Sequence, residues 1–189
     1  MLTCHLSSKE TDTAFNIRNF DINCGMNSKP KRRKNIRLKG FDYTGNAYVY
    51  FITICTHDKQ QYFRNAEIAK IIKDEIEFRM IKEIQLLCYC IMPDHLHMLL
   101  SLTEDYTKKG EGKSAGKGTL QNWVSAYKRY TSRIANQLFK IKPLWQKNFH
   151  DHVVRKEESL LKIAAYIVDN PVRKGMVSEW EEYLYSRIM

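Results

Sequence analysis

The sequence predicts an α+β fold, with one antiparallel sheet, helices packed mainly on one of its faces and a further helix toward the C-terminus. Runs rich in β-branched and aromatic residues alternate with segments whose apolar residues recur at helical spacing. Their order is strand, helix, strand, strand, helix, strand, helix, which suits helices lying on an antiparallel sheet. With 189 residues and 43% hydrophobic content, the chain can bury one core and is short for two domains.

Three strands and one helix make up the first half of the predicted fold. Residues 47–56 (AYVYFITICT) form a buried strand because β-branched and aromatic side chains dominate there. Residues 66–82 carry isoleucines at helical spacing and form an amphipathic helix. Two further strands cover 84–91 and 95–102, and Met92-Pro93-Asp94 is the bend between them because proline cannot donate to a central ladder.

The second half begins with residues 103–118, a Gly- and Lys-rich stretch that we expect to be a flexible insertion within the domain. A second helix follows over 120–139, and residues 145–155 form a short last strand. A third helix covers 157–170 and ends there because Pro171 disfavours helical geometry in the residue before it. The buried face of the second helix is expected to comprise Leu120, Trp123, Val124, Tyr127, Ile134 and Leu138.

Charge and composition favour a nucleic-acid partner. The chain has 31 Lys and Arg against 21 Asp and Glu, a net charge of +10, which attracts polyanions. We expect residues 1–28 to be a loosely ordered tail before a single domain over 29–189. Because no apolar run is long enough to span a bilayer and the N-terminus lacks a signal core, we expect a cytoplasmic protein, nucleoid-associated when bound to DNA. The five cysteines lack the spacing of a zinc ribbon.

Basic side chains that could contact phosphates lie in a basic arm over 29–39, on the second helix and in two C-terminal segments. Solvated charge on an ordinary surface is the alternative for each group. The candidates are Lys31, Arg32, Arg33, Lys34, Arg37, Lys128, Arg129, Arg133, Arg155 and Arg173.

His95-Leu96-His97 is the most distinctive pattern of the chain. Because side chains alternate across a strand, histidines at i and i+2 leave the same face and can hold one divalent cation. They could instead line a polar strand face, but histidines flanked by apolar runs inside a core strand need a reason to be there. The pair predicts a metal site that still lacks a third ligand.

Tyr166 and Asn170 offer complementary chemistry on the third helix. At about 100° per residue Tyr166 falls off the apolar stripe of the helix, and Asn170 lies one turn further on the same side. An exposed tyrosine and a C-terminal cap are the alternative interpretation. Together with His-x-His and the basic charge, the two residues favour a nucleophile beside a metal ligand.

Two imidazoles and an amide oxygen suit Mg²⁺ or Mn²⁺ better than a thiolate-rich zinc site does, and leave coordination positions for phosphate oxygens. Attack of Tyr166 on a phosphodiester would leave a phosphotyrosine, which conserves the energy of the broken bond for rejoining. Tyr127 and Tyr130 compete for this role. Tyr127 lies on the apolar stripe of its helix and is interpreted as core, whereas Tyr130 stays a candidate.

Five segments follow one another between Ile36 and Gly175: RLKGFDY (37–43), FITICT (51–56), MPDHLH (92–97), WQ (145–146) with DHVVR (151–155), and YIVDNPVRKG (166–175). Their combination and order resemble the REP-associated tyrosine transposases, a branch of the IS200-like single-tyrosine HUH transposases.

The resemblance implies a ferredoxin-like or RRM-like fold that cuts and rejoins single-stranded DNA near hairpins through a 5′-phosphotyrosine and a free 3′-hydroxyl. It would make His95 and His97 the histidine ligands of Mg²⁺ or Mn²⁺, Tyr166 the nucleophile and Asn170 the further metal ligand, where related branches carry glutamine. The partner would be hairpin-bearing single-stranded DNA, and no membrane association is expected. The protein would act as a monomer or a homodimer. The tail and the insertion at 103–118 look like additions to the family pattern.

Two other functions stay open. The same fold could be a catalytically idle single-stranded nucleic-acid-binding protein that stacks bases on aromatic and arginine side chains. It could also be a metal-dependent hydrolase in which water attacks and Tyr166 is incidental. A covalent protein–DNA adduct would separate the transposase from both.

Overall fold

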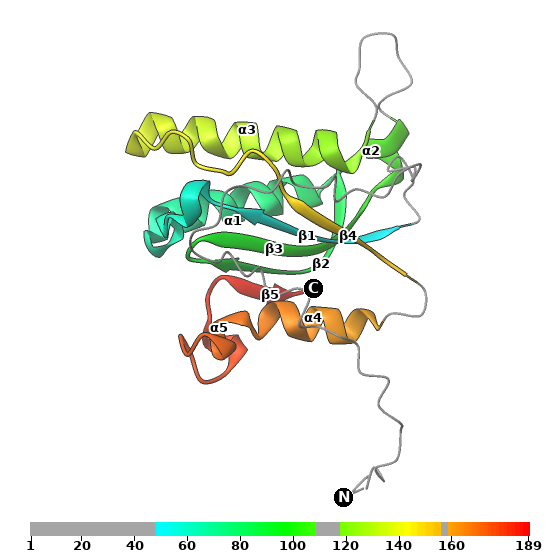
Figure 1. Cartoon of the computed structure of the whole chain (residues 1–189). Coiled ribbons are helices and arrows are strands. Elements are labelled where there is room, and N and C mark those ends of the chain that lie inside the picture. Colours follow the sequence, from blue (N-terminus) through cyan, green and yellow to red (C-terminus); the bar gives the residue numbers. More distant parts are fainter. Residues whose placement is uncertain (1–47, 109–117, 156–158) are drawn as a thin grey trace, which may run out of the picture. The chain divides into compact units, whose positions relative to one another are not determined.

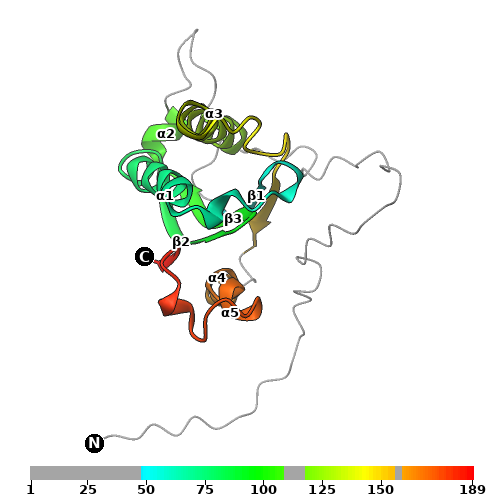
Figure 2. The ribbon, with the colours of Figure 1, turned by 90° about the vertical axis from the view of Figure 1, so that its left-hand side faces the viewer.

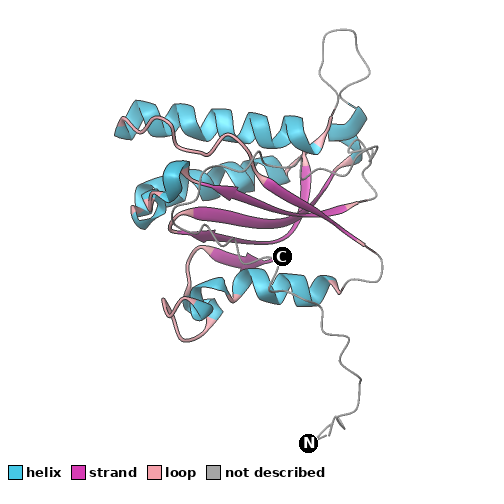
Figure 3. Cartoon of the chain, in the orientation of Figure 1, coloured by secondary structure: helices cyan, strands magenta, loops and turns pink. Residues whose placement is uncertain are grey.

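A computed structural model describes residues 48–108, 118–155 and 159–189, within the unit of residues 36–189, and contains a five-stranded antiparallel sheet (Figure 1; Figure 3). The strand order is β4-β1-β3-β2-β5. The predicted tail, its boundary at residue 28 and the basic arm lie outside the described residues. The strands are β1 (Val49–Cys55), β2 (Ile84–Met92), β3 (His95–Leu102), β4 (His150–Val154) and β5 (Ser186–Ile188).

Helices lie on both faces of the sheet, with α1 and α3 on one side and α4 and α5 on the other (Figure 2). The path β1-α1-β2-β3-α3-β4 with strand order β4-β1-β3-β2 is the ferredoxin-like arrangement, so the predicted fold class is confirmed. The helices are α1 (Ala66–Met80), α2 (Glu104–Lys108), α3 (Leu120–Phe139), α4 (Leu160–Val168) and α5 (Asn170–Arg173), with short 3-10 turns η2 (His57–Lys59), η3 (Tyr62–Arg64) and η4 (Trp180–Glu182).

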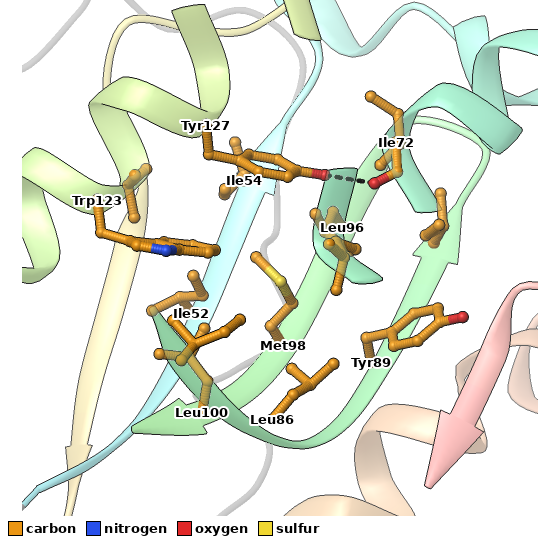
Figure 4. Packing of buried hydrophobic residues seen from close by; sticks show 14 of the residues in the cluster. Ile52, Ile54, Ile72, Leu86, Tyr89, Leu96, Met98, Leu100, Trp123 and Tyr127 are labelled. Atoms are coloured by element: carbon orange, nitrogen blue, oxygen red, sulfur yellow. Dashed lines mark hydrogen bonds between the residues drawn. The ribbon is translucent and has the colours of Figure 1, made fainter. Parts of the chain in front are cut away.

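The main core fills the space between the sheet and the helix pair α1 and α3. Ile52 and Ile54 of β1 point into it together with Met98 of β3, and Trp123 and Tyr127 of α3 lie above them (Figure 4). The Tyr127 hydroxyl donates to the Ile72 carbonyl oxygen at 2.9 Å, so this buried tyrosine satisfies its polar atom. Its interpretation as a core residue is confirmed. Because strands alternate, the odd-numbered residues of β1 and β3 face the opposite side of the sheet, toward α4.

Local signals explain where the predicted helices begin and end. The Asn65 side chain accepts from the Glu67 and Ile68 amides at the start of α1, and Ser159 accepts from the Lys162 amide at the start of α4. The helix that was expected to end at Asn170 ends at Val168 instead, and Asn170, the residue before the proline, begins α5. Pro171 occupies the first turn of α5, where its missing N–H costs nothing.

Three sequence expectations are corrected. The stretch after β3 is not all flexible connector, because α2 forms over 104–108 and Thr103 caps it by accepting from the Tyr106 amide at 3.2 Å. The buried face of α3 continues through Thr131 and Ala135, whereas Ile134 is partly exposed and Leu138 is 65% exposed. The strand at 145–155 is shorter than expected and is not the last, since β5 pairs with β2 near the C-terminus.

No helix among the described residues is long and apolar enough to cross a membrane.

Candidate active site

Strand register brings His95 and His97 to the α4 side of the sheet. On β3, His97 lies opposite Thr53 of β1, and His95 lies opposite Cys55. Helix α4 packs on this side, mainly against β2, β3 and β5. His97 is 3% exposed, while the His95 side chain keeps 15% of its surface exposed. The predicted pair therefore lies on the sheet face that α4 covers, with the His97 imidazole buried and the His95 imidazole partly accessible to solvent.

Each histidine uses one ring nitrogen to hold its orientation. His95 Nδ1 lies 2.6 Å from Asp94 Oδ1, and His97 Nδ1 lies 2.8 Å from Thr53 Oγ1. The two ring centroids are 4.6 Å apart at 76°. Protein histidines that bind metals commonly donate the second ring N–H to a carboxylate or another oxygen in this way. With Nδ1 donating, Nε2 of each ring carries the lone pair that a cation would use.

The tip of the β2–β3 turn is tied to the end of β1. The Thr56 amide and hydroxyl both donate to the Asp94 carbonyl oxygen, each at 2.9 Å, and the Phe63 amide donates to the Pro93 carbonyl oxygen at 3.0 Å. The turn that carries Asp94 and precedes His95 is thus anchored from two directions.

Burial and neighbouring charges shift the pKa values of His97 and Asp94. Burial, with further contributions from His95, Arg173 and Lys59, holds the pKa of His97 well below its ordinary value. Burial alone would raise the pKa of Asp94, but the hydrogen bond and charge of His95, together with Lys59, hold it below its ordinary value. His97 is therefore neutral and Asp94 ionised at neutral pH, which suits His97 as a ligand and Asp94 as the carboxylate that orients His95.

Tyr166 projects from α4 toward the same face. Its ring lies 6.4 Å from the His97 ring and 6.2 Å from the Phe51 ring, centroid to centroid. Cζ of Arg173, on α5, lies 4.5 Å from the centre of the Tyr166 ring, a cation–π distance. The structure brings the predicted nucleophile beside the histidines and adds one cation from the group predicted to contact DNA.

Asn170 begins α5 and is 6% exposed. Its Nδ2 donates to the carbonyl oxygens of Tyr166 at 2.8 Å and of Ile167 at 3.1 Å. The amide therefore satisfies the last carbonyls of α4, in the manner of the C-terminal cap considered above, and these bonds also fix its orientation. The same contacts tie Asn170 directly to the backbone of Tyr166.

His95, His97 and Asn170 are the candidate metal ligands. Within the described ranges, no group of three or more His, Cys, Asp and Glu side chains is arranged to hold a metal. The predicted ligand set is two imidazole nitrogens and the Asn170 amide oxygen, a mixed nitrogen and oxygen set rather than a thiolate site.

The predicted DNA-contacting cations separate into groups. The prediction that Lys128 contacts DNA is corrected, because its ammonium donates to the carbonyl oxygens of Gln146, Lys147 and Asn148. Burial lowers its pKa to about 8. Lys128 holds the segment before β4 and is committed to backbone rather than presented to phosphate.

Arg129 and Arg133 are exposed on α3, on the other side of the sheet from His97, and Arg133 stacks on Tyr130 with Cζ 5.2 Å from the ring centre. This position also separates Tyr130 from the histidines. Arg155 is exposed after the end of β4. The candidates of the basic arm, Lys31, Arg32, Arg33, Lys34 and Arg37, lie outside the described residues.

Sequence reasoning missed a second His-x-His on the histidine-bearing face. His150 of β4 lies opposite Thr53, and His152 lies opposite Phe51. Residues directly opposite in an antiparallel pair share a face, so both point to the side of His97. Their i, i+2 spacing was the available signal, and it matches that of His95 and His97.

The chain matches the family model described as "Transposase IS200 like" over residues 45–170. It is 28% identical over 160 residues to an uncharacterized protein of Haemophilus influenzae, covering 74% of this chain and 88% of that protein. It is 25% identical over 141 residues to a Haemophilus influenzae protein named as a REP-associated tyrosine transposase, covering 73% and 78%.

A solved structure of a REP-associated tyrosine transposase bound to a REP hairpin shares the fold, with a TM-score of 0.58 and 17% identity over 79% of this chain and 82% of that one. The family model spans more than half of the sequence and includes His95, His97, Tyr166 and Asn170. The chain therefore belongs to the IS200-like transposases, a family of enzymes.

Proposed function

We propose that this protein nicks and rejoins single-stranded DNA next to hairpins, with Tyr166 forming a covalent 5′-phosphotyrosine. One observation carries the proposal. The Tyr166 ring lies 6.4 Å from the ring of His97, whose Nδ1 is already held by Thr53. A metal-assisted attack on phosphorus requires a nucleophile beside the metal ligands. Here a phenol lies beside an imidazole pair whose Nε2 atoms are left for a metal ion.

His95 Nε2, His97 Nε2 and Asn170 Oδ1 would hold Mg²⁺ or Mn²⁺. When bound, the ion supplies a positive charge that orients and neutralises the phosphate oxygens. The chain's own residues do the rest. Asn170 ties the ligand set to the carbonyl of Tyr166, and α4 carries the phenol toward β1 and β3.

The substrate class follows from charge and from relatives. A net charge of +10 favours a polyanion, and a protein of the same fold is described as bound to a REP hairpin. Arg173, next to the Tyr166 ring, is the described cation best placed to contact the phosphate under attack. Arg155, Arg129, Arg133 and the basic arm are kept as candidate contacts to the flanking strand.

We propose that each site is built within one chain, a proposal supported by the 6.4 Å between the Tyr166 and His97 rings of the same chain. A monomer would then carry all the groups needed for cleavage.

The test mixes the protein with hairpin-bearing single-stranded oligonucleotides and Mg²⁺ or Mn²⁺, and looks for a protein–DNA adduct that survives SDS. Wild type should form it and Tyr166→Phe should not. Tyr130→Phe is the matched control, because Tyr130 lies on α3 across the sheet and should leave the adduct intact. An adduct in Tyr166→Phe would overturn the assignment of the nucleophile. Cleavage without any adduct would favour the water-attack hydrolase, and hairpin binding without cleavage the idle binding protein.

A further inference from the structure

The histidine-bearing face of the sheet extends onto β4. A row of directly paired residues runs across three strands from His97 through Thr53 to His150, and all three side chains point to the same side. The next row runs from Leu99 through Phe51 to His152. The two histidine pairs thus share one face with β1 between them.

In each row, the β1 residue lies between β3 and β4, and its size decides which β4 histidine can reach the site. Thr53 is small and already directs its hydroxyl to His97. Phe51 is large and 5% exposed, and its ring packs against both His97 and Tyr166. Only the small Thr53 side chain therefore lies between His150 and the site, whereas the Phe51 ring separates His152 from it.

The spacing suits a group held between the two strands. Neighbouring strands lie about 4.8 Å apart, so the backbones of His97 and His150 are separated by about 10 Å. A phosphodiester that lies on this face above Thr53 would have one imidazole on each side of it. His150 is half-buried on β4, so its ring is supported by the sheet and not carried on a loop.

The direction of attack distinguishes the two sides of the phosphate. In an in-line displacement the attacking and leaving oxygens lie on opposite sides of phosphorus. Tyr166 approaches from α4, which packs mainly on β2, β3 and β5. A phosphate attacked from the α4 side would then have its leaving oxygen on the side of β1 and β4, where His150 lies.

We propose that His150 is the proton donor to the leaving 3′-oxygen, an inference that rests on the proposed nuclease function. The Tyr166 oxygen bonds to phosphorus and its proton passes to solvent. The bond from phosphorus to O3′ breaks, its electron pair stays on O3′, and the proton from the His150 imidazolium completes the 3′-hydroxyl. In rejoining, neutral His150 accepts the proton of the attacking 3′-hydroxyl, as microscopic reversibility requires.

The test replaces the leaving oxygen. An oligonucleotide with sulfur at the bridging 3′ position of the scissile phosphate releases a thiolate, which needs no protonation. His150→Gln should slow adduct formation on the ordinary oligonucleotide by about 100-fold or more, the usual size of a general-acid contribution. On the 3′-thio oligonucleotide the variant should match wild type. His150→Ala with added imidazole serves as a second variant, expected to recover part of the lost rate.

His152→Gln is the matched control, since it lies on the same strand and face but behind Phe51, and it should change both rates little. Equal slowing of both oligonucleotides in His150→Gln would overturn the proposal and assign a structural role. Thio rescue in His152→Gln instead would overturn the choice of residue. Tyr166→Phe should be inactive on both substrates, and failure of wild type on both would contradict the nuclease proposal itself.

Discussion

The Thr53 hydroxyl lies 2.8 Å from Nδ1 of His97, and this bond joins β1 to β3 at the deepest point of the site. His97 is buried, so no solvent molecule replaces Thr53 easily as the partner of that nitrogen. The bond selects which nitrogen of the ring is left for a ligand, and it does so from a neighbouring strand rather than from the histidine's own.

Thr53→Val tests this role, because it removes the hydroxyl and keeps the side-chain shape. We expect the Mn²⁺ concentration needed for half-maximal adduct formation to rise by about 10- to 100-fold, the usual cost of losing a partner of a metal-binding histidine. Thr53→Ser should stay near wild type because it retains the oxygen. A Thr53→Val variant with unchanged Mn²⁺ dependence would show that the bond does not control the ligand.

The pKa of His97 predicts a dependence of stability on pH. Burial holds this pKa well below its ordinary value, so below about pH 6.5 the unfolded chain binds a proton that the folded chain does not. Stability from this group is complete above the unfolded pKa and falls as the pH drops through the window between the two pKa values.

We expect the metal-free wild type to lose up to about 1.4 kcal/mol of unfolding free energy per pH unit from His97 across that window. Urea unfolding of wild type and His97→Gln at several pH values isolates the contribution as a difference in slope. Equal slopes for wild type and His97→Gln would contradict the prediction.

The strongly periodic elements could be predicted from the sequence, and the weakly marked ones could not. Helices α1 and α3 follow apolar residues at helical spacing, and strands β1 to β3 follow runs rich in apolar, β-branched or aromatic residues. Strand β5 is three residues long and contains Arg187, so no periodicity marks it, and it forms only because β2 offers an edge. Helix α2 lies in a polar stretch, where its signals were the Thr103 cap, the acidic residues of its first turn and Lys108 in its last.

The buried face of α3 shows why apolar counting fails in part. Thr131 is fully buried, and its hydroxyl accepts from the Trp145 indole N–H at 2.8 Å. A polar residue that is satisfied by a partner from another segment cannot be identified from helical spacing alone. Leu138, by contrast, is apolar but lies near the end of α3 and remains exposed.

For the site, residue type and spacing pointed to His95, His97, Tyr166 and Asn170 as candidates, but not to their contacts. The contacts of Thr53 and Asp94 with the imidazoles depend on register and on the tight turn between β2 and β3. Lys128 was misassigned because a helix cation has the same sequence signature whether it contacts phosphate or backbone. Its carbonyl partners follow it by 18 to 20 positions.

Lys128→Met tests that correction. At pH 7 the Lys128 ammonium is charged, since its pKa of about 8 lies above that value, and it donates to backbone carbonyls at residues 146–148. Removing it should lower the unfolding free energy by about 1 to 3 kcal/mol, because these carbonyls lose a charged donor. Affinity for hairpin DNA should stay within about twofold of wild type when measured well below the unfolding midpoint. A large loss of DNA affinity with unchanged stability would restore Lys128 as a phosphate contact.

The proximity of Tyr166 to His97 within one chain predicts how mutant proteins behave in mixtures. Tyr166→Phe lacks the nucleophile and His97→Gln lacks a ligand, and each should be inactive alone. If each chain builds its own site, no pairing of the two variants can restore a complete one, so an equimolar mixture should form no adduct above the sum of the separate proteins.

If helix α4 were exchanged between two copies, one site of the mixed dimer would combine the intact Tyr166 of one chain with the intact His97 of the other. Recovery of about a quarter of wild-type adduct would then be expected, because half of randomly assorted dimers are mixed and one of their two sites is complete. The SDS-stable adduct, measured after the two proteins are mixed and allowed to exchange, separates these outcomes, and we expect no recovery.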